Sequence, residues 1–375
     1  MMFEITERVL LGEGVFRHSD GSWHLGTAPS PPLAWDTKER LGPIRRFLKR
    51  LKTEVDGYYD PERHSATYED LHFMASQVHD ALNREYENPA VRALIERLQS
   101  ESELFDPEPD ASVGRNWSLL DLSREATEYV HDVATALLGP PTRLDVLPFV
   151  VDACRDLPGS DLTIATLNHD TLIERILKHV GIEFSDGFGP AQPGVRYFDP
   201  ALLDASEELR LLKVHGSVNW FRLRPDEGDW TEDKVGIFET RDFYHSTRPD
   251  GRPQIPEERP TILIGTFNKQ IRYTDWFFSE IFSRFQQALK RVDTVVICGY
   301  GFGDKGINSQ ITQWIPMSEA HRVVVIHPRP DSVTSEARGA IQRAFHYLQS
   351  NGRLHLIPRP AHEAAWRLVL EGCGA

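Results

Sequence analysis

Residues Thr294 to Asp304 read TVVICGYGFGD, and this stretch does most to decide the fold. An uncharged, largely apolar run comes first, and a glycine-rich turn follows it directly. The residues after the turn, Ile307 to Trp314, have the pattern of a helix. A strand with both faces apolar, followed by a turn and a helix, is typical of a parallel sheet that helices cover on both faces.

Three other short apolar runs also end in polar, glycine or proline residues. Ligands of an open parallel sheet bind in the crevice outside the carboxyl ends of its strands. We therefore expect the residues that follow these strands to meet in one cleft and to form a nucleotide-binding site that also carries catalytic side chains. The runs and the residues that follow them are Leu162 to Thr166 with Asn168 and Asp170, Leu209 to Val214 with His215, and Arg322 to Ile326 with His327 and Pro328.

Composition narrows the class of protein. The chain has 375 residues, of which 40% are hydrophobic and 26% charged, so it can form one large domain or a domain with a subdomain. Its net charge of −14 argues against non-specific nucleic-acid binding. Its three cysteines form no C-x-x-C pair, which excludes a four-cysteine zinc module. Without an apolar stretch near 18 residues, we expect a cytoplasmic protein with no membrane contact.

The remaining segments suggest how the chain is organised. Arg8 to Leu11 is predicted to be a first strand, and Val15 to Leu33 a hairpin and loop. Residues 35–150 have a mainly helical character, with one apolar stripe formed by Leu71, Met74, Ala75, Val78 and Leu82. From Asp161 onward strands and helices alternate. Further elements are a strand at Thr261 to Ile264, an irregular surface excursion at 224–260 and a helix at Ser332 to Ser350.

Each candidate residue also has a purely structural interpretation. Asn168 and Asp170 can hold a water or a ribose hydroxyl, or they can cap a helix that begins near Thr171. His215 can accept a proton near neutral pH, or it can simply bond to the backbone.

The glycine-rich turn has two interpretations as well. Its glycines would let backbone N–H groups approach phosphates, or they serve a tight turn. The turn lacks the third glycine of G-x-G-x-x-G. His327 can meet a nucleotide, whereas Pro328 can simply end the strand.

Taken together and in this order, these segments resemble the sirtuin-like family, in particular the bacterial sirtuin-like domains of anti-phage defence. The resemblance covers roughly residues 160–330 well and the N-terminal third loosely. Its most specific part is the stretch KVHGSVNW at Lys213 to Trp220. The other matching positions are Thr166, Asn168 and Asp170, then Gly299, Tyr300, Phe302, Asp304, Ile307 and Asn308, then Ile326 and Pro328.

The resemblance implies a single sirtuin-like domain over residues 1–375. It would be an α/β fold with a Rossmann-like parallel sheet, helices on both faces and a helical subdomain inserted at 35–150. The implied substrate is NAD. Because the four-cysteine zinc module of the deacylases cannot form, the implied reaction is NAD+ hydrolysis, which needs no metal.

Site roles follow from the same resemblance. Asn168 would position the attacking water or the ribose, His215 would act as general base, and Asp170 would orient the nicotinamide amide. The implied cofactor-binding residues after the core strands are Thr166, Gly299, Tyr300, Gly301, Asp304 and His327.

The family's first strand normally ends in G-A-G-x-S, a loop that wraps the pyrophosphate. Two stretches compete for this place. Gly12 to Phe16 contains Glu13, whose carboxylate would stand beside phosphates. Gly26 to Ser30 keeps small residues, so we assign Gly26, Thr27 and Ala28 to cofactor binding.

The irregular first loop leaves an alternative function open, a catalytically weak module that binds NAD or ADP-ribose as a sensor or assembly subunit. The resemblance also implies a homo-oligomer or association with a partner defence protein. An ordinary dehydrogenase is disfavoured, because G-x-G-x-x-G is missing and no separate substrate domain is recognisable.

Overall fold

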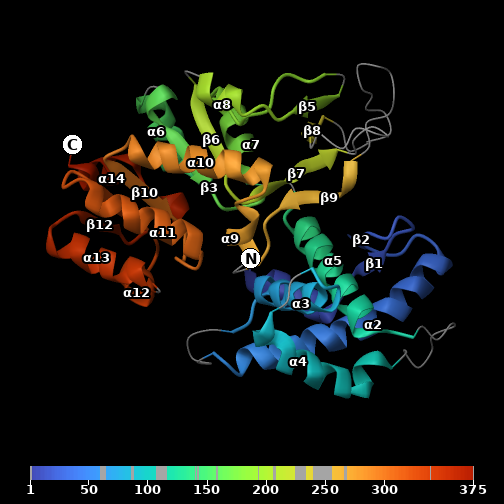
Figure 1. Ribbon diagram of the computed structural model, residues 1–375. Coiled ribbons are helices and arrows are strands. Elements are labelled where there is room, and N and C mark those ends of the chain that lie inside the picture. Colours follow the sequence, from blue (N-terminus) through green and yellow to red (C-terminus); the bar gives the residue numbers. More distant parts are fainter. Residues whose placement is uncertain are drawn as a thin grey trace. The chain divides into compact units, whose positions relative to one another are not determined.

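The computed structural model describes residues 2–374, with several internal gaps (Figure 1). The chain divides into two compact units. Unit 1 comprises Met1–Gly139 with Ile264–Asn268, and unit 2 comprises Pro140–Leu263 with Lys269–Ala375. The residues outside the described structure are 1, 60–64, 86–87, 107–115, 140, 142, 158, 193, 206–207, 224–233, 240–255, 266–267, 338 and 375.

Unit 1 is mainly helical and carries one short antiparallel hairpin. The apolar stripe expected around Leu71 lies on α3, where Leu71, Ala75 and Val78 are fully buried. Its elements are α1 (Met2–Leu11), β1 (Val15–Arg17), β2 (Trp23–Leu25), α2 (Pro31–Asp56), α3 (Tyr68–Leu82), α4 (Pro89–Ser100), η1 (Ser102–Phe105) and α5 (Leu119–Leu137).

The predicted first strand at Arg8 to Leu11 is wrong, because these residues form the last turn of α1. Ile5 and Val9, four residues apart, are both buried, which is the spacing of one helix face. The helix ends at Leu11, and the next residue is Gly12, whose φ of +66° suits glycine. The hairpin predicted in the following segment is confirmed by β1 and β2.

The described residues of unit 2 form three sheets. Two are three-stranded and parallel, in the orders β3-β6-β4 and β10-β11-β12, and the third is four-stranded, antiparallel and ordered β5-β8-β7-β9. The strands are β3 (Thr163–Thr166), β4 (Phe184–Ser185), β5 (Val195–Tyr197), β6 (Leu209–Lys213), β7 (Gly216–Leu223), β8 (Lys234–Phe238), β9 (Pro256–Ile262), β10 (Thr294–Cys298), β11 (Arg322–Ile326) and β12 (Leu354–Ile357).

The expected α/β fold with parallel strands is therefore confirmed, with two corrections of detail. The strand predicted from Thr261 belongs to β9, which pairs antiparallel with β7 rather than joining a parallel sheet. The helix predicted over Ser332 to Ser350 is two helices, and Gly339, with φ of +68°, precedes the second. The excursion predicted at 224–260 is wrong where the structure describes it, because residues there form β8 and the first part of β9, and the rest of the segment lies outside the described residues.

Strand β11 shows why a continuous apolar run suits this fold. Val323 and Val325 belong to a hydrophobic cluster on one face of its sheet, whereas Val324 and Ile326 belong to a second cluster. Helices supply the facing side chains of both clusters, as a parallel sheet covered on both faces requires. The helices of unit 2 are α6 (Pro148–Asp156), α7 (Leu172–His179), α8 (Ala201–Ala205), α9 (Asn268–Arg272), α10 (Trp276–Lys290), α11 (Lys305–Trp314), α12 (Pro330–Glu336), α13 (Ala340–Ser350) and α14 (Trp366–Cys373), with short 3-10 turns between some elements.

Each parallel sheet ends at a strand with an exposed apolar residue. Within the described residues β3 pairs only with β6, and β10 pairs only with β11. Ala165 in β3 is exposed, and Val296 in the middle of β10 is 36% exposed. The sequence of β10 has both faces apolar, as a covered strand does, whereas within the described residues β10 lies at the edge of its sheet.

The junction between β6 and β7 sets a strict steric limit that can be tested. Gly216 has φ of +83°, and a Cβ at this position would lie 2.1 Å from the Thr261 carbonyl oxygen. We expect Gly216→Ala to lower the free energy of unfolding by more than about 2 kcal/mol in urea denaturation, since strain and overlap add. Gly352→Ala is the matched control: φ is +64° but the space is open, so about 1 kcal/mol is expected. Equal losses in the two variants would contradict the close approach.

Candidate active site

The carboxyl ends of strands from the two parallel sheets of unit 2 meet at one buried contact. His215 follows β6, and its Nε2 lies 3.2 Å from Oδ2 of Asp304, which follows β10. The Tyr273 hydroxyl lies 2.8 Å from the same Nε2 and 3.5 Å from Oδ2 of Asp304. Three polar side chains from three segments of the chain therefore share one small volume.

These three side chains are almost completely removed from solvent. His215 is 3% exposed, Tyr273 7% and Asp304 8%. Burial lowers the pKa of His215 from its ordinary 6.5 to about 4. The charge of Lys269 lowers it further, while the hydrogen bond and charge of Asp304 oppose both effects. At neutral pH the imidazole is therefore uncharged and able to accept a proton.

The pKa of Asp304 is also lowered, which for a carboxyl group favours the charged form. Burial opposes its ionisation, but His215 and the backbone N–H of Ile307 favour the carboxylate more strongly, so its pKa lies below the usual range. Its Oδ1 accepts the Ile307 N–H at 2.9 Å, which makes Asp304 the N-cap of α11. One carboxylate thus begins a helix with one oxygen and contacts the histidine with the other.

A neutral imidazole carries one proton, and His215 has polar partners on both sides. The Leu167 backbone accepts a hydrogen bond from the ring, while Tyr273 and Asp304 meet Nε2. The hydroxyl of Tyr273 can donate to a bare Nε2 or accept from a protonated one. The group can therefore take up a proton and stabilise it with the nearby carboxylate, which is the requirement for general base chemistry.

The glycine-rich turn after β10 is held by its aromatic residues. Phe302 has φ of +54° and is 1% exposed, so its buried ring fixes an unfavourable backbone conformation. The Tyr300 hydroxyl donates to Oδ1 of Asn308 at 2.9 Å and accepts the Asp304 N–H at 3.1 Å. Tyr300 thus fastens the turn to the start of α11.

The glycines of this turn face open space. All three are exposed, and a Cβ on any of them would meet no atom within 4 Å. Only Gly299, with φ of +67°, needs glycine for its conformation. Neither packing nor backbone conformation requires glycine at Gly301 or Gly303. Close approach of a ligand is therefore a reason for glycine at these two positions.

The two candidate residues after β3, Asn168 and Asp170, differ in their surroundings. Asn168 is exposed, and its backbone N–H donates to Oγ1 of Thr166 at 3.1 Å. Asp170 accepts the Leu172 N–H at 2.8 Å, so it serves the first turn of α7 as the structural interpretation expects. Its assignment to the nicotinamide amide stays a prediction.

A buried ion pair supports this loop. Lys213 is 1% exposed and lies 3.1 Å from Oε1 of Glu174 on α7. Its ammonium also donates to the backbone carbonyl of Asp170. The lysine of the stretch KVHGSVNW therefore fastens α7 to β6 beside the histidine.

His327 follows β11 and accepts the Arg329 N–H at Nδ1, 3.0 Å away. Its role toward a nucleotide stays a prediction. Gly26, Thr27 and Ala28 belong to unit 1, in the loop between β2 and α2. The competing stretch begins at Gly12, directly after α1, and runs into β1. Both stretches adjoin an antiparallel hairpin, not a parallel strand.

The comparison with known protein families agrees with this geometry. A family model described as a SIR2-like domain matches residues 162–350, which include β3, the His215 segment and the glycine-rich turn. The chain belongs to the SIR2-like family. Members of this family are generally NAD-dependent enzymes. None of the curated proteins compared with the chain matches it.

Other features of this SIR2-like protein fall outside the strand ends. A hollow of about 440 Å³ between α6 and α14 has carboxylates and guanidinium groups side by side, and no predicted site residue lines it. Among the helices that the structure describes, none is long and apolar enough to cross a membrane. The three cysteines are free thiols.

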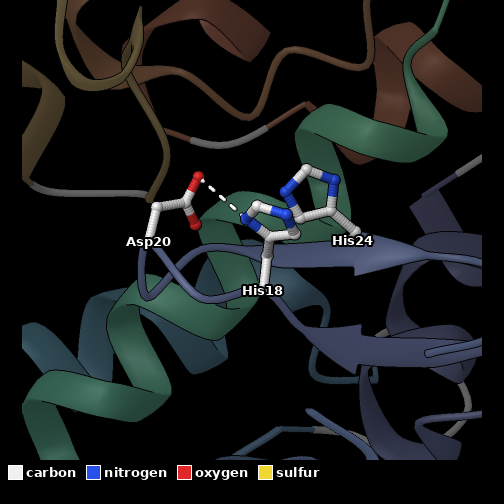
Figure 2. Close-up of side chains that lie close together, drawn as sticks. All are labelled: His18, Asp20 and His24. Carbon is white, nitrogen blue, oxygen red and sulfur yellow. Dashed lines mark ion pairs between the residues drawn. The ribbon is translucent and has the colours of Figure 1, made fainter. Parts of the chain in front are cut away.

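Sequence reasoning missed two sets of residues. Tyr273 and Lys269, next to His215, lie in a segment without a motif, and only the fold brings them to the site. In unit 1, a side-chain cluster of His18, Asp20 and His24 (Figure 2) lies on the hairpin. A signal for it exists in the sequence, since the spacing H-x-D-x-x-x-H is local.

The lowered pKa of His215 predicts a pH dependence of stability. Between pH 6.5 and about 4 the unfolded chain binds a proton at His215 that the folded SIR2-like protein does not, so stability falls as pH falls. From pH 7 to pH 5 this contributes a loss of about 2 kcal/mol. Urea denaturation at both pH values should show that loss in wild type and a smaller one in His215→Gln. An identical pH dependence in both proteins would contradict the buried neutral imidazole.

Proposed function

We propose that this SIR2-like protein hydrolyses NAD+ to nicotinamide and ADP-ribose. The observation that carries the proposal is the buried contact of His215 with Asp304 and Tyr273 at the strand ends. Its imidazole is neutral at physiological pH, and its proton-bound form has a carboxylate beside it. A neutral imidazole beside a carboxylate suits a reaction in which water loses a proton as it attacks.

The reaction balances with these groups. The bond between ribose C1′ and the nicotinamide nitrogen breaks, and its electron pair returns to the ring, which leaves as neutral nicotinamide. The oxygen of water bonds to C1′, and the proton of that water passes to His215 and then to solvent. Asn168, which follows β3 and is exposed, is the residue that would position the water or the ribose.

The glycine-rich turn would receive the phosphates. The N-terminus of α11 is already capped by Asp304, so the helix end offers less to an anion than an uncapped one. The backbone N–H groups of the turn, with open space at Gly301 and Gly303, are the better partners. Thr166, Tyr300 and His327 complete the proposed binding residues.

A second candidate is a module that binds NAD or ADP-ribose with little turnover, as a sensor or assembly subunit. It is favoured by β3 and β10, which are edge strands in the described structure, and by the antiparallel setting of both candidate pyrophosphate loops. Under either function, we propose that the protein acts in anti-phage defence, as its resemblance implies, with a second copy or a partner protein.

Turnover by purified protein tests the catalytic assignment. We expect NAD+ consumption with nicotinamide release, and a loss of at least about 100-fold in His215→Ala and in Asn168→Ala, because a general base contributes that much. His179→Ala, an exposed histidine at the end of α7, is the matched control and should keep full activity. Turnover that is unchanged in His215→Ala would overturn the mechanism. Wild type that binds ADP-ribose without turnover would select the second candidate.

The glycine-rich turn gives a separate prediction. Gly301→Val should weaken ADP-ribose binding at least tenfold in calorimetric titration, because the side chain would project into the phosphate space. Its melting temperature should stay within about 2 °C of wild type, since the position is open and its φ is not positive. Gly57→Val, at an exposed position away from the turn with φ of −64°, tests the specificity of the binding loss. Unaltered binding in Gly301→Val would remove the turn from the site.

A further inference from the structure

The hairpin of unit 1 gathers three side chains with metal-binding atoms. His18 follows β1, Asp20 lies in the turn, and His24 lies on β2. One ring nitrogen of each histidine and one carboxylate oxygen of Asp20 lie within 4.8 Å of one another. Figure 2 shows the ring of His18 between the carboxylate of Asp20 and the ring of His24.

The backbone of the turn fixes this arrangement. The His18 N–H donates to the Ser22 carbonyl at 2.8 Å, and Gly21, with φ of +88°, donates to the His18 carbonyl at 3.1 Å. His24 pairs with Phe16 across the hairpin, and their rings stack with centroids 5.6 Å apart. The ring of His24 is therefore supported by a neighbour on the opposite strand.

Ser22 orients the carboxylate and one imidazole. Oδ1 of Asp20 accepts the Ser22 N–H at 2.9 Å and the Ser22 hydroxyl at 2.5 Å. The same hydroxyl lies 2.9 Å from Nε2 of His24. With Oδ1 engaged, Oδ2 of Asp20 is left to face His18. Outer contacts of this kind hold ligands in place at protein metal sites.

The His18 imidazole has a nitrogen available on this side. Its Nδ1 is buried and lies 3.2 Å from Oδ2 of Asp20. Zinc bonds of about 2.0–2.1 Å in a tetrahedron place two ligand atoms about 3.3 Å apart. The histidine and aspartate are thus already spaced as two ligands of one ion.

We propose that His18, Asp20 and His24 bind a zinc ion, with water as the fourth ligand. Two imidazoles and one carboxylate suit zinc, whereas magnesium and calcium prefer oxygen ligands alone. Asp20 and His18 have side chains 61% and 41% exposed, so they can move to close the remaining separation from His24. The bound ion would join the turn to β2 and stabilise the hairpin.

The simpler interpretation is an ion pair between His18 and Asp20. It explains their 3.2 Å contact, but it gives no role to His24 or to the hydroxyl of Ser22 that links His24 with Asp20. An exposed ion pair also contributes little, about 0–1 kcal/mol. The convergence of a second imidazole is what favours the metal.

Zinc titration of the full chain tests the proposal. Protein treated with EDTA and freed of any affinity tag is titrated calorimetrically with ZnCl2, then with MgCl2. We expect one zinc per chain, no magnesium at this site, and a zinc affinity at least about tenfold weaker in Asp20→Asn and in His24→Ala. Cobalt should give the absorption of a tetrahedral ion in wild type and lose it in both variants.

Two controls keep the outcome clear. His362→Ala removes another exposed histidine beside a carboxylate, 3.6 Å from Glu363, and should bind zinc as wild type does. His215→Ala should also keep zinc binding, which separates this site from the proposed hydrolase. Wild type that binds no zinc, or binding that survives the combined change of His18 and His24 to alanine, would overturn the proposal.

Discussion

The contact between His215 and Asp304 is the constraint on which the described site depends. It joins the carboxyl end of β6 to the turn after β10, and so it joins the two parallel sheets of unit 2. Asp304 also begins α11, and Tyr300 fastens the turn to the same helix. Displacing the carboxylate would therefore disturb the base, the helix start and the glycine-rich turn together.

Much of unit 2 could be predicted because its signals are local. The apolar runs of β3, β6, β10 and β11 and the turns after them are short patterns, and each strand lies where its pattern indicates. Tyr273 could not be predicted, because it reaches His215 through a fold that brings together residues 58 positions apart. The error at Arg8 to Leu11 has a local cause: four residues are too few to distinguish a strand from the end of a helix.

The two proposed sites are built on different physical principles. The strand ends of unit 2 bury a titratable group and shift its pKa, so that a neutral imidazole stands beside a carboxylate. The hairpin of unit 1 instead holds exposed and half-exposed side chains together through its turn and through Ser22. Burial suits proton transfer, whereas exposed donors suit capture of an ion from solution.

The central claim is that a nucleotide binds where His215, Asp304 and the glycine-rich turn meet. A crystal structure of the protein soaked with ADP-ribose tests this claim most directly. The account predicts the ribose beside His215 and Asn168, and the two phosphates against the backbone of Gly299 to Gly303. ADP-ribose bound elsewhere, with the turn empty and the histidine out of reach, would contradict it.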